Sequence, residues 1–357
     1  MTLKNHALRF AAFALIGALA MTSAGCLYLK RWQWSQMVLP GEQEPDQSTE
    51  ILVGEYYPFS SRPPYERQNP LLSLRQPPTL QIDRDYPRLD GATSFFPIYA
   101  TAAGEIYRAE TEAEKLARRA AVNFSRTPRA YGNLIRGQAD MVFALAPSSE
   151  QKKKAAEAGL SLRLTPIAKE AFVFIVNEHN PVRELSLEAV RAIYSGEISN
   201  WKAVGGLDEE IIPFQRPDDS GSQSIMLQEV MRGTPIRKPF MEETRLGMGI
   251  LLYSVAGYRS RLTNALGYSF HFYATRMNPV AGVRLLAING VAPTPENIRN
   301  QSYPLLVDVY MVTARPLSEN TQKLHDWFLS AEGQQLIEAV GYTPLRPPQN
   351  SGEHAGH

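Results

Sequence analysis

The chain has 357 residues, which is enough for two lobes, because a single hydrophobic core stops growing at roughly 250–300 residues. Its hydrophobic content of 44% and charged content of 20% are those of a soluble globular protein. The net charge of +1 argues against nucleic acid as a partner, so any selectivity for anions has to come from a local site.

The first 26 residues are typical of a targeting segment. Lys4 and Arg9 form a short positive region, residues 10–21 are apolar, and the small residues 23–25 precede Cys26, the only cysteine of the chain. This pattern resembles a bacterial lipoprotein signal, and it predicts an exported protein that is lipidated at Cys26 and faces the periplasm or the cell exterior. An ordinary cleaved signal peptide and an uncleaved anchor are the alternatives, but a spanning helix needs about 20 apolar residues.

Residues 27–88 predict a tether between the membrane and the globular body. From Gln43 to about Arg88 the sequence is rich in Pro, Gln, Ser and charged residues, which favours an extended chain. A strand-like piece at residues 50–57 interrupts it. At the other end of the chain, residues 347–357 are polar and predict a disordered tail.

From residue 86 onward, strand-like and helix-like segments alternate. Pro97 is expected to begin a long helix that continues through Ala121, and Ser186 is expected to cap a later helix. Strands are expected at 122–124, 140–146, 162–166, 171–177, 211–214, 266–273 and 307–313, and helices at about 127–137, 149–159, 186–195 and 320–340, the last a pair that ends at Gly341. This alternation predicts a mostly parallel α/β arrangement in two lobes, with a ligand beyond the carboxyl ends of the strands.

The stretch from Gln215 to Ser224 combines a strand end, a turn and the start of a helix. The first N–H groups of a helix have no partner within it, and the aligned peptide dipoles add positive charge there, so the position favours an anion. Ser220 and Ser222 add hydroxyl donors, and Gly221 lets a ligand approach the backbone. Arg216 adds a planar guanidinium that matches a tetrahedral oxyanion. A capped helix beside a surface arginine explains the same residues.

Two other expected helix starts also carry hydroxyl groups. Thr93 and Ser94 precede the helix that Pro97 begins, and Thr127 precedes Pro128 at the start of another. Three such starts that converge in a cleft would replace the hydration shell of an anion with neutral donors, and Arg216 would be the main countercharge. For each start, simple capping is the alternative.

Motifs at these helix starts also carry a family resemblance. Asp90–Tyr99, DGATSFFPIY, resembles the Gly-Ala-Thr-Phe-Pro segment of phosphate-binding proteins of ABC importers, and Arg216-x-x-x-Ser220-Gly221-Ser222 resembles their Arg-x-x-x-Ser-Gly-Thr motif. Further stretches resemble other elements of that family in the same order along the chain: 177–181, 193–201, 266–268, 330–334 and 341–344. The ordered set covers about residues 90–345.

This resemblance implies an α/β type II periplasmic-binding-protein fold, in which two α/β lobes joined by a two-crossover hinge close on an oxyanion. One lobe would contain residues 89–177 with about 275–346, and the other would contain residues 178–274. The implied protein is a monomeric extracytoplasmic solute-binding protein that captures an inorganic oxyanion, above all phosphate, for an ABC permease. It implies no enzyme activity, no cofactor and no metal.

The resemblance also implies which residues bind the anion. These are Thr93 and Ser94, then Thr127 or Ser125, and then Arg216, Ser220, Gly221 and Ser222. One contact of the family does not carry over, because Leu145 stands where the family has a carboxylate. A carboxylate there accepts a hydrogen bond from a protonated phosphate oxygen and repels sulfate. Either Asp218 or Asp219 takes over this role, or the site prefers another oxyanion.

Two other functions stay open. The missing carboxylate and the unusual segment before residue 88 suggest a sensor or docking protein of the same fold that feeds no transporter. A phosphoester hydrolase that uses Asp218, Asp219 and Arg216 is the weaker alternative, since the chain has no nucleophile elbow, zinc-protease motif or phosphate-binding loop of known type. The six histidines are scattered, and His271 is interpreted as a core residue of the strand expected at 266–273.

Overall fold

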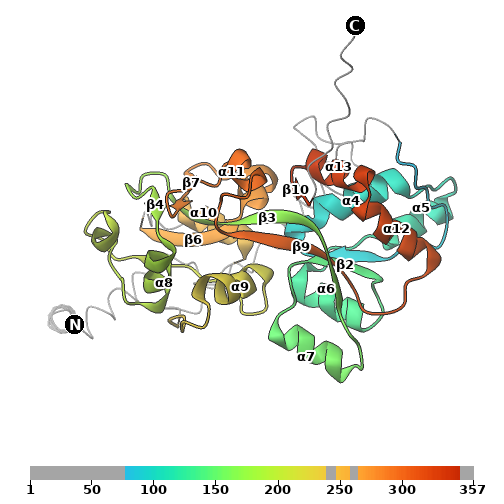
Figure 1. The fold of residues 1–357 in the computed structure, drawn as a ribbon, viewed down its shortest axis with the longest axis horizontal. Helices are drawn as coiled ribbons and strands as arrows, with labels where there is room; N and C mark the ends of the chain where they lie inside the picture. The colour runs from blue at the N-terminus through green and yellow to red at the C-terminus, as the bar shows by residue number, and fades with distance from the viewer. Residues whose placement is uncertain (1–76, 239–246, 258–263, 346–357) are drawn as a thin grey trace, which may run out of the picture.

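The computed structural model describes residues 77–238, 247–257 and 264–345. Figure 1 shows two halves that are linked by β3 (Arg163–Asn177) and β9 (Leu306–Thr313). The predicted signal peptide, Cys26, most of the predicted tether and the predicted tail lie outside the described residues. None of the described helices is long and apolar enough to cross a membrane.

A mixed sheet of eight strands passes through both halves. Its order is β1-β2-β9-β3-β6-β5, and β10 and β7 also pair with β3. The remaining strands of this sheet are β1 (Leu89–Gly91), β2 (Met141–Ala144), β5 (Ile212–Pro213), β6 (Ala265–Phe270), β7 (Val283–Leu285) and β10 (Thr343–Pro344). A small second sheet pairs β4 (Glu184–Leu185) with β8 (Ala287–Ile288).

The expected mostly parallel arrangement is wrong. Within the large sheet β1 pairs with β2 and β5 pairs with β6 in parallel, whereas the pairs of β9 with β2 and of β3 with β9, β6, β7 and β10 are antiparallel. The reason lies in the link between the halves, because β3 and β9 lie side by side there and run in opposite directions. The alternation of strands and helices along a sequence does not reveal that the chain comes back to the first half through β9, antiparallel to β3.

β3 serves both halves of the molecule. Its first part, Arg163–Ala171, pairs with β9, and its last part, Phe172–Asn177, pairs with β6 and β7. Separate strands at 162–166 and 171–177 were predicted, and that prediction is wrong. The segment between them stays in the ladder, because Lys169 pairs with Asp308 of β9 and their side chains form an ion pair at 2.9 Å.

The exact domain boundaries stay a prediction. Strand pairing adds one observation, which concerns the range from about 275 to 346 that was assigned to the first lobe. In that range β7 pairs with the last part of β3 and β8 pairs with β4, and Figure 1 shows β7 and β4 near β6.

The long helix expected from Pro97 to Ala121 is also wrong, because two helices occupy this range. α4 (Phe96–Ile106) ends at Tyr107, whose backbone is extended, and α5 (Glu112–Ala120) begins after Thr111. Thr111 and Glu114 form a reciprocal capping box, which supplies a new helix start. The strand expected at 122–124 is a single bridge between Val122 and Leu89.

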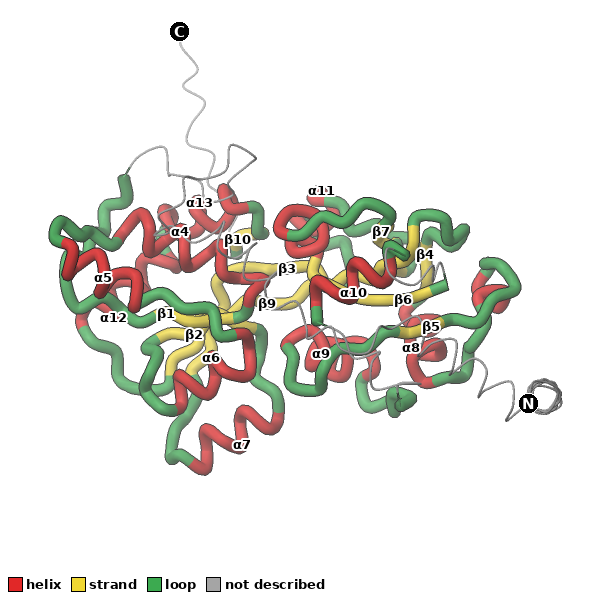
Figure 2. The backbone as a smooth tube through the Cα atoms, turned by 180° about the vertical axis from the view of Figure 1, so that it is seen from behind, coloured by secondary structure: helices red, strands yellow, loops and turns green. Residues whose placement is uncertain are grey.

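Helices lie on both faces of the sheet in each half. Figure 2 shows α4 and α13 (Ala331–Val340) on one face of the first half, with α6 (Arg126–Ile135) and α7 (Ser149–Glu157) on the other. In the second half, α10 (Met248–Val255) and α11 (Pro295–Arg299) lie opposite α8 (Leu187–Ser195) and α9 (Gly221–Ile225). α12 (Glu319–Leu329) precedes α13, and a π-helical turn, Met226–Met231, continues α9.

Several predicted helix ends are confirmed by their caps. The Ser186 side chain accepts a hydrogen bond from the N–H of Ala189 at the start of α8, and Gly341 ends α13 with a left-handed φ of 111°. The strand expected to reach Tyr273 is wrong, because β6 ends at Phe270 and residues 271–277 form a helical turn. His271 therefore begins this turn, and the Thr275 hydroxyl donates to its carbonyl.

Candidate functional site

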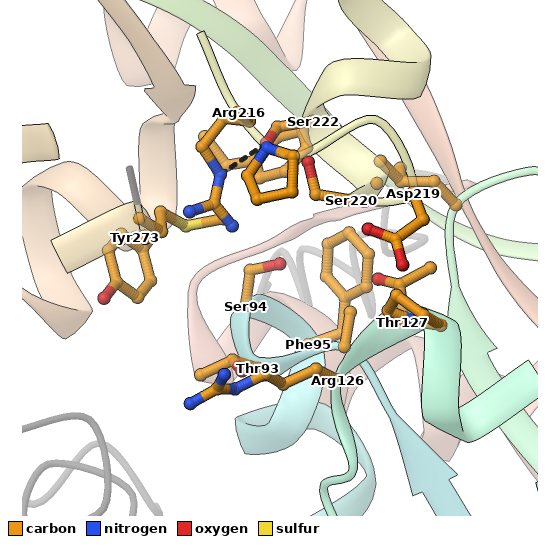
Figure 3. A pocket seen from close by; sticks show the side chains of 18 of the residues that line it. Thr93, Ser94, Phe95, Arg126, Thr127, Arg216, Asp219, Ser220, Ser222 and Tyr273 are labelled. Carbon is orange, nitrogen blue, oxygen red and sulfur yellow. Dashed lines mark hydrogen bonds between the residues drawn. The ribbon is translucent and has the colours of Figure 1, made fainter. Parts of the chain in front are cut away.

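A cavity of about 300 Å³ lies between the two halves (Figure 3). This volume is at the lower end of the range for small-molecule sites, about 300–1,000 Å³. The first half contributes residues 92–95, 126–128 and Leu145. The second half contributes residues 216–222 without Asp218, residues 247–250, and Phe270 and Tyr273.

The cavity brings together most of the residues predicted from the sequence. Those that line it are Thr93, Ser94, Thr127, Arg216, Asp219, Ser220, Gly221 and Ser222. Asp218 and Ser125 are not among the described residues that line it. Asp218 is exposed in the turn before Ser220.

Ser125 has a structural role at the start of α6, where it forms hydrogen bonds within the first half. Its N–H donates to Asp90 Oδ1 at 2.7 Å, and its hydroxyl accepts from Asn133 Nδ2 at 3.1 Å. Asp90 is buried and also accepts from the N–H of Gly91 and from Asn133 Nδ2. The carboxylate therefore ties the end of β1 to the start of α6, and thereby fixes two edges of the cavity relative to each other.

The first helix start is held rigidly. Thr93–Phe95 form a short 3-10 turn that leads into α4, and the N–H of Ala92 donates to the Phe143 carbonyl of β2 at 2.9 Å. The Tyr342 hydroxyl donates to the carbonyl of Ser94, which is buried. Figure 3 shows the Ser94 side chain directed into the cavity.

The second helix start brings in a residue that sequence reasoning missed. Arg126 is the first residue of α6, and its φ of 64° is unusual for a residue other than glycine. Both Arg126 and the buried Thr127 line the cavity. The only signal in the sequence was the place of Arg126 directly before Thr127 and Pro128, at an expected helix start.

The third helix start holds Arg216 in place from its backbone outward. The Arg216 N–H donates to the Tyr268 hydroxyl at 2.9 Å and to Gln223 Oε1 at 3.1 Å, and Nε donates to the Ser222 hydroxyl at 3.2 Å. Ser220 caps α9 by accepting from the N–H of Gln223. In Figure 3 the Arg216 guanidinium extends into the cavity toward Ser94 of the opposite half.

The two halves approach each other closely at Gly221. A β-carbon on this residue would lie 3.3 Å from Leu145 Cδ1 and 3.3 Å from Thr127 Oγ1, both in the first half. The start of α9 therefore approaches the start of α6 closely, which brings the second and third helix starts to the same wall of the cavity.

The cavity carries two guanidinium groups and one carboxylate among its described residues, from Arg126, Arg216 and Asp219. Arg216 was predicted as the main countercharge, and Arg126 is a second cation at the cavity that the prediction did not include. Burial raises the pKa of Tyr273, and the positive charges of Arg216 and Arg126 both oppose that shift, so both guanidinium groups act on this edge of the cavity. Leu145 is buried, and its side chain offers no acceptor.

The chain matches the family model described as a PBP superfamily domain over residues 83–332. It belongs to the PBP superfamily. Among curated relatives, the phosphate-binding protein PstS of Borreliella burgdorferi is 26% identical over 220 residues, which cover 59% of this chain and 76% of the relative. PstS of Bacillus subtilis is 25% identical over 171 residues, which cover 48% of this chain and 53% of the relative.

Solved structures of PBP superfamily proteins are similar in fold. A putative phosphate ABC transporter substrate-binding protein from Clostridium perfringens, solved with bound phosphate, has a TM-score of 0.54 and 24% identity, covering 72% of this chain and 98% of that one. An ABC-type phosphate transport receptor from Vibrio cholerae has a TM-score of 0.51 and 20% identity, covering 71% and 98%. The predicted type II periplasmic-binding-protein fold and the family resemblance are confirmed.

Other cavity residues of this PBP superfamily chain gave no usable signal in the sequence. Residues 247–250 were not assigned to any expected element, and Phe270 and Tyr273 were interpreted as part of a strand. Phe270 lines the cavity as the last residue of β6, and the helical turn that follows places Tyr273 there. No group of three or more His, Cys, Asp or Glu side chains that could hold a metal ion occurs within residues 77–238, 247–257 and 264–345.

Proposed function

We propose that the protein is an extracytoplasmic solute-binding protein that captures an inorganic oxyanion, above all phosphate, and delivers it to an ABC importer. One observation carries this proposal, namely that hydroxyl groups from three helix starts and the Arg216 guanidinium line a single cavity between two halves. The names of the relatives, phosphate-binding protein PstS, support phosphate as the ligand.

The chemistry of the cavity suits a dehydrated oxyanion. The first N–H groups at the starts of α4, α6 and α9 have no acceptor within their helices, and they carry the positive ends of the helix dipoles. Thr93, Ser94, Thr127, Ser220 and Ser222 add hydroxyl donors around the same space. We propose these residues, with Gly221 and Arg216, as the ligands of the anion. Donors that are already held in place lose little freedom when the anion arrives.

We add Arg126 to this set of proposed ligands. It reaches the cavity from the first half, whereas Arg216 reaches it from the second half. A divalent oxyanion between them is held by one guanidinium from each half, so its charge favours contact between the halves. This arrangement suits a protein that closes on its ligand.

We propose that Asp219 supplies the acceptor that Leu145 lacks. In Figure 3 the Asp219 carboxylate points toward the Thr127 side of the cavity, opposite the Arg216 guanidinium. There it can accept a hydrogen bond from a protonated phosphate oxygen, while it repels sulfate, which carries no proton at neutral pH.

Replacing Asp219 with Asn should therefore reduce the preference of the site for phosphate over sulfate by about tenfold, since a hydrogen bond to a charged group contributes about 1.5–3 kcal/mol and this carboxylate is exposed. Calorimetric titration of both anions measures that ratio. Asp218→Asn is the matched control, because it removes the same charge one residue earlier, outside the cavity. An unchanged ratio in the Asp219 variant, equal to that of the control, contradicts the role of Asp219.

The remaining parts of the proposal concern the setting of the protein. The last part of the predicted tether is wrong, because residues 77–88 pack on the first half, where Ile82 is buried and bridges Tyr107 and Arg88 pairs with Asp140. We propose that a lipid on Cys26 anchors the protein to a membrane, that the tether is limited to residues 27–76, and that the binding protein is a monomer without enzyme activity. The relatives are named as binding proteins, which supports a role in binding.

Calorimetric titration of the purified protein with phosphate and with sulfate tests the function. Saturable phosphate binding is the expected result. Binding of neither anion favours the alternative of a sensor or docking protein with the same fold, and the loss of the carboxylate at Leu145 is the observation behind that alternative. Turnover of a phosphoester overturns the proposal in favour of a hydrolase. A permease gene beside the gene for this protein distinguishes transport from sensing.

A further inference from the structure

Glu170 lies where β3 passes from one half of the molecule to the other. It pairs with Val307 of β9, and two residues later Phe172 pairs with Phe270 of β6. Only 3% of Glu170 is exposed, although it is an acidic residue. A buried carboxyl group at the crossover has no part in the proposed anion site, and strand packing does not require it.

The hydrogen bonds of Glu170 are incomplete. Its Oε1 accepts from the N–H of Ala171 at 2.7 Å and, weakly, from the N–H of Phe272 at 3.4 Å. Its Oε2 is buried and has no hydrogen-bond partner among the described residues. An ionised carboxylate with an unsatisfied buried oxygen is costly, whereas the protonated form carries no net charge. Burial accordingly raises the pKa of Glu170 to about 8, against the opposing effect of these two N–H groups.

Phe272, whose N–H donates to Glu170, lies at the boundary between the halves and beside the anion cavity. Phe272 stands between Phe270 and Tyr273, which both line that cavity. The Phe272 ring stacks on Tyr342, with ring centres 4.3 Å apart, and the Tyr342 hydroxyl donates to the carbonyl of Ser94. Separation of the halves at the cavity would therefore pull Phe272 away from Tyr342, and the N–H of Phe272 is one of the two donors to Glu170.

We propose that Glu170 couples closure of the two halves to the uptake of one proton. In the closed arrangement the carboxyl group is buried and keeps its proton. When the halves separate, water reaches the crossover and the group ionises as an ordinary glutamic acid does. No bond other than the O–H bond forms or breaks, and the proton comes from solvent. The inference rests on the proposed function only in its use of phosphate to drive closure.

Other titratable groups do not account for such a proton. The segments next to Glu170 carry Lys169, Asp308, His271, Tyr273, Arg276, Tyr303 and Tyr342. Burial raises the pKa of Tyr273, which therefore stays protonated. Lys169 and Asp308 form an ion pair with each other. Burial, aided by the charge of Arg276, lowers the pKa of His271 to about 4, so this ring is neutral near pH 7. Burial raises the pKa of Tyr303, which therefore stays protonated. The pKa shift of Glu170 itself comes from burial and backbone N–H groups, without a charged side chain.

The sign of the coupling follows from the two protonation states. In this structure, which we take as the closed form, burial raises the pKa of Glu170 to about 8, and in the proposed open form the exposed group has the ordinary value of 4.5. Closure is therefore favoured at low pH and is progressively lost as the pH rises from about 4.5 to about 8, by up to tenfold per pH unit for a single proton. Above about pH 8 to 9 the group is ionised in both forms, and the dependence ends.

Calorimetric titration with phosphate at pH 7 in buffers of different ionisation enthalpy tests the proposal, because it counts the protons taken up on binding. The wild-type protein is expected to take up about one proton more per phosphate than Glu170→Gln, whose neutral amide mimics the protonated acid. Glu178→Gln, at an exposed position just beyond β3, is the matched control and should keep the wild-type count. Equal counts in the wild type and in Glu170→Gln overturn the proposal.

Two further measurements keep the test decisive. If Glu170→Gln does not fold, the number of protons that the wild type takes up per phosphate is measured at pH 7 and at pH 9.5. This number should fall by about one at pH 9.5, and an equal number at both pH values overturns the proposal. If the wild type does not bind phosphate, the proposed function fails, and small-angle scattering of the ligand-free protein tests Glu170 separately. The radius of gyration should rise from pH 5 to pH 9 in the wild type, and no rise overturns the proposal.

Discussion

Replacing Arg216 with Gln is expected to weaken phosphate binding by about 100-fold, or about 3 kcal/mol, with little loss of folding stability. The charged guanidinium of Arg216 can donate two parallel hydrogen bonds to an oxyanion. The amide of Gln is neutral, so it cannot replace these charge-assisted bonds. The backbone of residue 216 keeps its hydrogen bonds to Tyr268 and Gln223, so the turn itself should survive. Calorimetric titration measures the affinity, and thermal unfolding without ligand measures the stability.

Arg129→Gln is the matched control for this experiment. Arg129 is exposed on α6 and is not among the described residues that line the cavity, so the control removes one positive charge without touching the proposed ligands. Its phosphate affinity should stay within about twofold of the wild type, since exposed charges are largely screened by salt. Equal affinities of both variants would mean that Arg216 contributes only to the general charge of the surface, and the proposed site would then be wrong.

Much of the cavity was predictable from local sequence signals. Three signals affect the backbone over only a few residues: a serine or threonine before a helix, a proline in its first turn, and a glycine near a ligand. Thr127, Ser220 and Gly221 could therefore be recognised one segment at a time. What joined the segments was a family resemblance, because spacing along the chain does not say which helix starts meet in space. The structure lines one cavity with them.

Other features depend on contacts between distant parts of the chain, and these were missed. Arg126 reaches the cavity because its backbone turns with a positive φ, which no pattern in the sequence announces. β3 stays continuous through Lys169 and Glu170 because β9 pairs with both of them, although two charged residues in succession read as a loop. The antiparallel sheet follows from the same pairing.

Glu170 shows most clearly what a single sequence cannot predict. In the sequence it follows a lysine and precedes an apolar run, so it reads as one of two charged residues in a loop between two strands. Only the folded chain buries it, leaves Oε2 unsatisfied and gives it an N–H donor from Phe272, which is 102 residues away. Buried groups of this kind come from tertiary packing, and a single sequence carries no trace of that packing.

The motif Ser330-x-x-Gly333-Gln334 also acquires a physical reason in the folded chain. Ser330 ends α12 and caps α13, since its hydroxyl accepts from the N–H of Gly333 and donates to the Trp327 carbonyl. Gln334 donates to the Ile167 carbonyl of β3 and accepts from the N–H of Leu345. The corner between the two helices therefore anchors α13 to the strand that links the halves.

Gly333→Ala is expected to destabilise the protein by about 3 kcal/mol, which lowers the unfolding temperature by roughly 6–12 °C. A β-carbon at this position would lie 2.2 Å from the Trp327 carbonyl oxygen and 2.7 Å from Phe328 Cα, and backbone atoms cannot yield as a flexible side chain does. Thermal unfolding measures the effect, with Gln335→Ala, at an exposed position of the same helix, as the control. α13 packs against α4, and the 3-10 turn that leads into α4 lines the cavity. A tolerated alanine would therefore mean that the corner can open, and that the first helix start is less rigidly held than its contacts indicate.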